Sequence, residues 1–175
     1  MADNPPKEFP HEMHPSDRRS NREDFQAAVI KYFGEYGEGA VSAIMGHARH
    51  ESAGTFHPNL PQVIGKGETL RYAKPGEGYA WGPLQFEERS HEGVYQTWRK
   101  QNKLEDTNDS RVRYLKSSIF EKNSLGMDQM GAGNAAAIRK ALQSKEDHVV
   151  IGGLIGERFL RAAEYQSEDW FKKTY

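Results

Sequence analysis

The sequence predicts an α+β fold that is mostly helical and carries one small β element. Apolar residues recur at helical spacing over most of the chain, which favours amphipathic helices. The segment 54–82 interrupts this pattern with frequent glycine and proline, so short strands and loops are expected there. A chain of 175 residues can bury one core and requires no second domain. We therefore expect a flexible N-terminal arm, 1–19, and one folded domain, 20–175.

The N-terminal part is expected to contain the arm and two helices. Residues 1–19 hold four of the eight prolines, which is typical of a frayed terminus or of an arm that docks on a partner. Ser20 and Glu23 form a capping-box pattern that would begin the first helix, which ends near 34–37. A second helix is expected from about Glu38 to Glu51. Its apolar stripe consists of Val41, Ile44, Met45 and Ala48.

The C-terminal part is expected to be helical, with two breaks. A helix from about Glu87 to Lys100 is followed by a polar cluster, 106–110, which caps the next helix. That helix carries Val112, Leu115, Ile119 and Phe120 on one side. A glycine-rich joint, 126–133, separates it from two further helices, 134–144 and 148–165.

Composition excludes several classes of protein. The chain is 36% hydrophobic and 28% charged, and no apolar run approaches the roughly 20 residues that span a bilayer, so no membrane insertion is expected. A net charge of −1 argues against a nucleic-acid partner. The absence of cysteine removes disulfides, thiol nucleophiles and cysteine-based zinc sites. The N-terminal residues lack the apolar core of a signal peptide, so none is expected.

Two short segments carry the chemistry, Met45 to Phe56 and Gly78 to Phe86. The first places Glu51 where a helix breaks into Ser-Ala-Gly. The second is a turn rich in glycine and aromatic residues that ends in Gly82-Pro83-Leu84-Gln85. A carboxylate at a buried helix end is well placed for acid catalysis, and the turn would bring an amide side chain against it. Together the two segments predict a sugar-cleaving cleft.

These segments resemble the lysozyme-like superfamily, in the branch that contains soluble lytic transglycosylases, goose-type lysozymes and phage tail lysozymes. In that branch a Glu-Ser pair closes a helix and is followed by a Gly-Leu-Met-Gln-type turn. Glu51-Ser52 and Gly82 to Gln85 fill these positions, with departures at Pro83 and Leu84. The segment between the two motifs is also longer than usual in the branch.

The later chain is similar to phage tail lysozymes as well. The similar features are a helix near Arg111 to Phe120, the pair Glu157-Arg158, and a closing segment from Arg161 to Ala163. The resemblance covers roughly residues 22 to 166. It implies a lysozyme-like fold.

The resemblance also implies a function. We expect a peptidoglycan glycosidase, or muramidase, of phage type that cleaves between N-acetylmuramic acid and N-acetylglucosamine without a cofactor. Bacterial peptidoglycan would be its partner, and other phage tail or virion proteins are further candidate partners. It would reach the periplasm and cell wall from a virion or from the host cytoplasm. The alternatives are a lytic transglycosylase that gives 1,6-anhydro products, a catalytically silent virion adaptor, and a chitinase-like enzyme on a related polymer.

Glu51 is the candidate general acid. A carboxyl group in a partly apolar pocket stays protonated near neutrality and can donate to the leaving oxygen; the plain alternative is a solvated side chain near a helix end. A second carboxylate would be a base or a nucleophile, and Glu77 and Glu68 are available. Glu77 is preferred, because goose-type lysozymes carry an acidic residue at nearly this place, although it could equally be a solvated turn residue. If neither approaches Glu51, a transglycosylase with one glutamate as acid and base is favoured.

The candidate substrate-binding residues are Gln85, Ser52, Tyr79, Trp81 and Glu68. Gln85 would hydrogen-bond the sugar or orient the acid, or else cap a loop. Ser52 suits a backbone cap better than a nucleophile, because no His-Asp arrangement would activate it. Tyr79 and Trp81, together with Tyr72, could stack on sugar faces or be ordinary core residues, whereas Trp98 is assigned to the core.

His47 and His50 offer a competing interpretation as a metal site, since two histidines three apart share a helix face. Zinc hydrolases of this kind use His-Glu-x-x-His or His-x-x-Glu-His, and His-Ala-Arg-His-Glu is neither. We therefore expect no metal, and place both histidines on the polar side of the helix.

Overall fold

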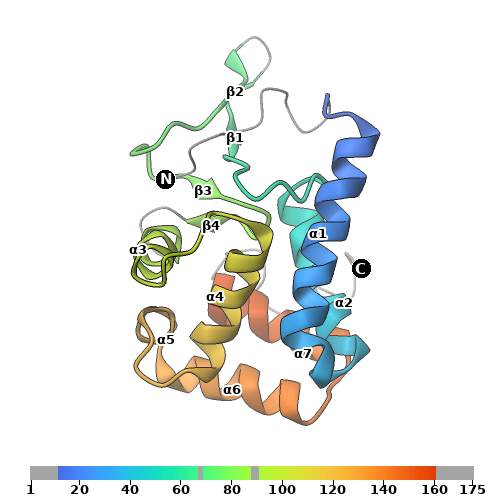
Figure 1. Ribbon diagram of the computed structural model, residues 1–175, viewed down its shortest axis with the longest axis vertical. Coiled ribbons are helices and arrows are strands. Elements are labelled where there is room, and N and C mark those ends of the chain that lie inside the picture. Colours follow the sequence, from blue (N-terminus) through green and yellow to red (C-terminus); the bar gives the residue numbers. More distant parts are fainter. Residues whose placement is uncertain (1–11, 67–68, 88–90, 161–175) are drawn as a thin grey trace.

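The computed structural model describes residues 12–66, 69–87 and 91–160. These residues form a mostly helical α+β architecture, as the sequence predicts (Figure 1). The helices are α1 (Pro15–Phe33), α2 (Glu38–Glu51), α3 (Gly93–Gln101), α4 (Asn108–Phe120), α5 (Leu125–Met130), α6 (Ala132–Gln143) and α7 (His148–Ile155). A 3₁₀ turn, Gly34–Tyr36, follows α1, and a π-helical turn, Gly156–Leu160, continues α7. In the described part of the chain, no helix is both long and apolar enough to cross a membrane.

The helices form the body of the molecule, and the strands lie at one end of it. Helix α2 packs on α7, α1 packs on α4, and α4 packs on α5. Figure 1 shows α6 at the end of the body opposite to β1 and β2, which lie near the N-terminal turns of α1. The C-terminal end of α2 and the start of α1 therefore both face the β element.

The β element consists of two short antiparallel hairpins. The strands are β1 (Val63–Ile64), β2 (Arg71–Tyr72), β3 (Ala80–Trp81) and β4 (Phe86–Glu87). Val63 pairs with Tyr72 in the first hairpin and Trp81 pairs with Phe86 in the second. An isolated bridge between Pro61 and Trp81 joins the two. The β element predicted for 54–82 is therefore present, and it extends to Glu87.

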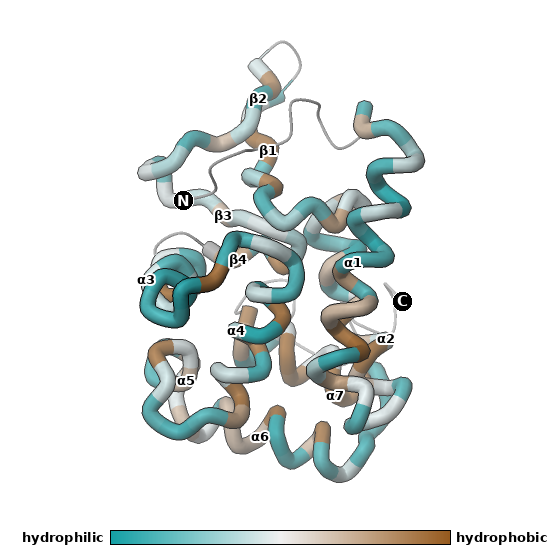
Figure 2. The backbone as a smooth tube through the Cα atoms, viewed as in Figure 1, coloured by the Kyte–Doolittle hydropathy of each residue, from teal (hydrophilic) through white to brown (hydrophobic). Residues whose placement is uncertain are grey.

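The core lies between the helices and is rich in aromatic rings. Phe86 contacts the rings of Tyr95, Tyr114 and Phe159 edge-on, at centroid distances of 6.2, 5.7 and 5.7 Å. Pairs in this geometry stabilise a fold by about 0.5–1.5 kcal/mol each beyond the burial of their area. Figure 2 shows that α7 is apolar over much of its length, which agrees with its position against α2 inside the body.

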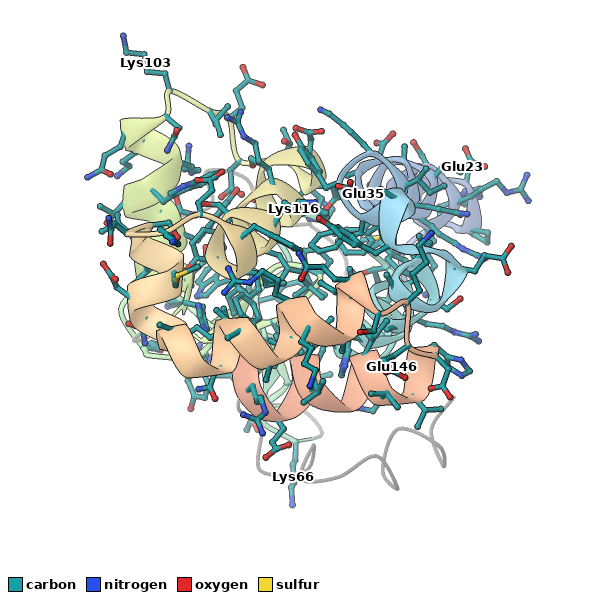
Figure 3. All side chains as sticks on the ribbon, turned by 90° about the horizontal axis from the view of Figure 1, so that it is seen from below. Glu23, Glu35, Lys66, Lys103, Lys116 and Glu146 are labelled. Atoms are coloured by element: carbon teal, nitrogen blue, oxygen red, sulfur yellow. The ribbon has the colours of Figure 1, made fainter. Side chains whose placement is uncertain are left out.

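Lys116 connects α4 to the end of α1. Its Nζ atom donates to a carboxylate oxygen of Glu35 at 2.8 Å and to the hydroxyl of Tyr36 at 2.7 Å, and Figure 3 shows Lys116 and Glu35 close together. The same ammonium lies over the rings of Tyr36 and Phe120 at 4.2 and 4.4 Å. A cation over aromatic faces is attracted by their quadrupoles, so this contact helps to fix α1 against α4.

Two helix starts differ from the prediction. Helix α1 begins at Pro15, not at Ser20, because proline suits the first helical position and the His14 side chain accepts from the Ser16 backbone amide. Residues 15–19 thus belong to the folded domain, and residues 1–11 lie outside the described part. Helix α3 begins at Gly93, not at Glu87, because Glu87 pairs in β4.

Two predictions for the C-terminal part also change. The expected glycine-rich joint contains helix α5, and the chain turns only at Gly131, whose φ is +92°. The last helix was expected to reach Tyr165, but α7 ends at Ile155 and the π-helical turn follows it. Positions 161–165 lie outside the described residues. The predicted second helix, Glu38 to Glu51, is confirmed.

Candidate active site

Glu51 and Gln85, which are 34 positions apart, line one pocket of about 540 Å³. The described lining also includes Arg18 from α1, the α2 end through Ala53, and the segment 60–63 before and within β1. The pocket therefore lies where α1, the end of α2, the β element and the Gly82–Gln85 turn meet. The two motifs singled out in the sequence come together in space.

Helix α2 directs Glu51 inward. Ile44, His47 and Ala48 are fully buried, and Glu51 continues the same stripe, three and four residues further on. Glu51 is the last residue of the helix, and its Oε1 atom is shielded from solvent. Leu60 and Val63 line the same pocket. Glu51 is thus a partly buried carboxyl group in a pocket that apolar side chains also line.

Ser52 shapes the helix end. Its hydroxyl donates to the carbonyl of Ala48 at 2.5 Å and accepts from the backbone amide of Phe56 at 3.0 Å. The side chain is fully buried. Both contacts are to backbone, as expected for a cap, and they fix the turn that leaves Glu51 at the pocket edge.

The Gly82–Gln85 turn holds the amide of Gln85 in the pocket. Gly82 has φ +76°, and Gln85 has φ +48°. The Gln85 amide nitrogen donates to the carbonyls of Leu60 and Gly82, at 3.1 and 2.7 Å. The nitrogen is therefore used to hold the loop, as in the loop-cap interpretation, while the amide oxygen is the atom that remains to accept from a ligand.

A buried cluster of charged side chains, Arg111 with Glu92 and Asp106, lies against this turn. A Cβ on Gly82 would lie 2.6 Å from Nη1 of Arg111, so only glycine fits. Arg111 is 1% exposed and donates to both carboxylate oxygens of Glu92, at 2.7 and 3.1 Å. Its Nε lies 3.1 Å from Asp106. Burial lowers the pKa of Arg111, but the charges of Glu92 and Asp106 outweigh it and hold that pKa above its usual value.

Glu77 lies in a different environment from Glu51. Its carboxylate accepts hydrogen bonds from both terminal nitrogens of Arg71, at 2.9 Å each, and from the backbone amide of Lys74 at 2.8 Å. These bonds, the one with Arg71 first, lower the pKa of Glu77 to about 2. Glu77 is not among the described residues that line the Glu51 pocket. Glu68, the other candidate, lies outside the described residues.

The aromatic candidates divide by exposure. Trp81 is only 3% exposed, so its faces are covered and, of the two alternatives, it is a core residue and does not present its ring to a sugar. Its pairing with Phe86 and its bridge to Pro61 place it inside the β element. Tyr79 is 38% exposed and keeps an accessible ring, and Tyr72 is partly exposed. Trp98, at 5%, is a core residue, as expected.

His47 does not lie on the polar side of α2, so that prediction is wrong. Its side chain is fully buried, and Nε2 is 2.8 Å from the carbonyl oxygen of Gly152 in α7. Burial lowers its pKa to about 4. His50 is exposed. Within the ranges that the structure describes, no cluster of three or more metal-ligating side chains occurs.

Two arginines near the pocket were not predicted from the sequence to be part of it or of its support. Arg18 was assigned to a flexible arm, yet it lines the pocket that holds Glu51. Pro15 followed by Asp17, a proline and an acid typical of a first helical turn, was the available signal. Arg111 carries no local signal of burial, because its carboxylate partners come from another helix and a loop.

Comparison with protein-family models, with curated proteins and with solved structures gives no match to this chain. Its function is therefore inferred from the side chains in the pocket and from the motif resemblance.

Proposed function

We propose that the protein cleaves the glycan backbone of bacterial peptidoglycan, between N-acetylmuramic acid and N-acetylglucosamine, with Glu51 as the general acid on a lysozyme-like fold. The observation that carries the proposal is the shared pocket of Glu51 and Gln85. The two residues belong to the Glu-Ser and Gly-x-x-Gln motifs that resemble those of lysozymes and lytic transglycosylases.

Proton donation by Glu51 would break the bond to the leaving sugar oxygen. Glu51 is partly buried, and Leu60 and Val63 line the same pocket. The amide oxygen of Gln85 would accept from a sugar hydroxyl or acetamido group and hold the ring in register. Positioned proton transfer of this kind accelerates a reaction by about 100- to 10,000-fold.

Glu51 is the only carboxylate among the described residues that line the pocket. An enzyme with one such group can use it twice, first as acid and then as base, while a hydroxyl or acetamido group of the substrate attacks the sugar carbon. This arrangement favours the lytic transglycosylase form, with 1,6-anhydro products. A muramidase that gives reducing ends requires a further group to position the attacking water.

The test is cleavage of purified cell wall, with mass analysis of the products. The wild type should release 1,6-anhydro fragments, and Glu51→Gln should lower the rate by about 100-fold or more with an unchanged thermal unfolding curve. Glu38→Gln is the matched control, because it makes the same change at the exposed start of the same helix. Reducing ends would identify a hydrolase. No product from the wild type would identify an adaptor, and a Glu51→Gln rate above about a tenth of wild type would exclude Glu51 as the acid.

A further inference from the structure

A second pocket, of about 620 Å³, adjoins the first. It is formed by the facing sides of α1 and α2, and it shares Arg18 and Ala53 with the Glu51 pocket. Arg22 lies one helical turn after Arg18 on the same face of α1, and Arg49 enters from α2. We call this feature the arginine pocket.

The arginine pocket concentrates positive charge in a protein that is otherwise balanced. The whole chain has 24 basic and 25 acidic residues, whereas the described lining of this pocket contains three arginines and no carboxylate. Arg22 and Arg49 are exposed, and neither forms an ion pair within the described ranges. Positive charges gathered in one pocket lining attract an anionic ligand.

The position of the arginine pocket indicates which anion it meets. Because Arg18 and Ala53 line both pockets, a group attached to a glycan in the first pocket can enter the second. In peptidoglycan the muramic acid residues carry peptide stems with free carboxylates, and each stem is attached to a sugar next to the bond to be cut. Guanidinium groups bind carboxylates through two parallel hydrogen bonds. Met45 and Phe56 add apolar surface to the lining, which suits the methyl groups of stem alanines.

We propose that the arginine pocket binds the carboxylates of the peptide stem, so that the protein prefers glycan that still carries its peptides. This inference rests on the proposed function, because it assumes that peptidoglycan occupies the Glu51 pocket. It adds a second contact, which selects the peptide-bearing polymer over bare chitin-like glycan.

The test compares peptidoglycan glycan with and without its stems, which an amidase removes. The measured quantity is the ratio of kcat/KM on peptide-bearing glycan to kcat/KM on bare glycan. For Arg22→Gln/Arg49→Gln this ratio should fall about tenfold, equivalent to about 1.4 kcal/mol. Arg18 is left in place because it also lines the Glu51 pocket. Arg19→Gln/Lys140→Gln is the matched control, since it removes two exposed positive charges outside both pockets and should keep the wild-type ratio.

A wild-type ratio near one, or an equal loss of ratio in the control, would overturn the proposal. The same ratio is also measured on wall from which hydrofluoric acid has removed the phosphate polymers. If the preference disappears on the treated wall, which still carries its stems, the pocket binds phosphate and the proposal is wrong.

A binding arm separates this inference from the proposed function. Calorimetry with Glu51→Gln compares a soluble disaccharide-peptide with the same disaccharide lacking the peptide. Tighter binding of the peptide form, lost when Arg22→Gln/Arg49→Gln is added, supports the arginine pocket even if the wild type cleaves no wall. Equal binding of the two ligands, or no binding of either, refutes it.

Discussion

Acid should destabilise this protein through His47, which lies one turn before Glu51 on α2. The imidazole is fully buried against Gly152, and burial lowers its pKa from 6.5 to about 4. The unfolded chain therefore binds a proton at about pH 6.5, while the folded protein binds it only near pH 4. The free energy of unfolding falls as the pH drops through this window and is unaffected by His47 above it. At about 1.4 kcal/mol per pH unit, the loss is about 3 kcal/mol.

The assay is urea unfolding followed by circular dichroism at pH 7 and pH 4, for the wild type and His47→Gln. Glutamine can keep a donor near the Gly152 carbonyl and does not titrate. The two proteins will differ in stability at pH 7, so the compared quantity is the loss between the two pH values. His47→Gln should lose about 3 kcal/mol less than the wild type. Equal losses would show that His47 accepts a proton in the folded protein as readily as in the unfolded chain, and would refute the reasoning.

Two further substitutions probe the Gly82–Gln85 turn and the role of Glu77. Gly82→Ala should lower the free energy of unfolding by about 2 kcal/mol or more and impair wall cleavage, because φ is +76° and the new Cβ would lie 2.6 Å from Arg111. Gly76→Ala is the control for the backbone contribution, since Gly76 has φ +88° and open space around it. Equal effects of the two substitutions in thermal unfolding would contradict a role for Arg111. Glu77→Gln should change the rate of wall cleavage by less than about threefold, because Glu77 is bound to Arg71 outside the described pocket lining, whereas a loss of about 100-fold would restore it as the catalytic base.

The sequence predicted best where periodicity and breakers agree. The second helix was predicted with its true bounds, because its apolar stripe runs between Gly37 and the Ser-Ala-Gly break. The same stripe explains the error at His47, which lies three residues after Ile44 and four after Ala43 and so faces inward. His47 was placed on the polar side because histidine is polar, although its position in the helix points inward. By the same geometry Glu51 faces inward too, which is why its placement could be predicted.

The failures arise from contacts that no local pattern records. The capping-box pattern at Ser20 and Glu23 predicted a later helix start, but proline also suits a first helical position and α1 begins at Pro15. The burial of Arg111 depends on Glu92 and Asp106, which reach it from separate elements. The arginine pocket likewise needs two helices to meet. Tertiary contacts of this kind follow from the fold and are not present in any short window of sequence.

The contrast between the two glutamates bears on the chemistry that is possible here. A general base works best when its pKa lies near the operating pH, because it must be ionised and still accept a proton readily. Arg71 and the Lys74 amide hold the pKa of Glu77 at about 2, which makes it a weak proton acceptor at neutral pH. Glu51 shares its pocket with Leu60, Val63 and Gln85. If Glu51 gives its proton to the leaving oxygen as proposed, its own carboxylate becomes the base available among the described lining residues. In the proposed reaction a hydroxyl of that same sugar would give up its proton to Glu51 as it attacks the sugar carbon, which would yield the 1,6-anhydro product.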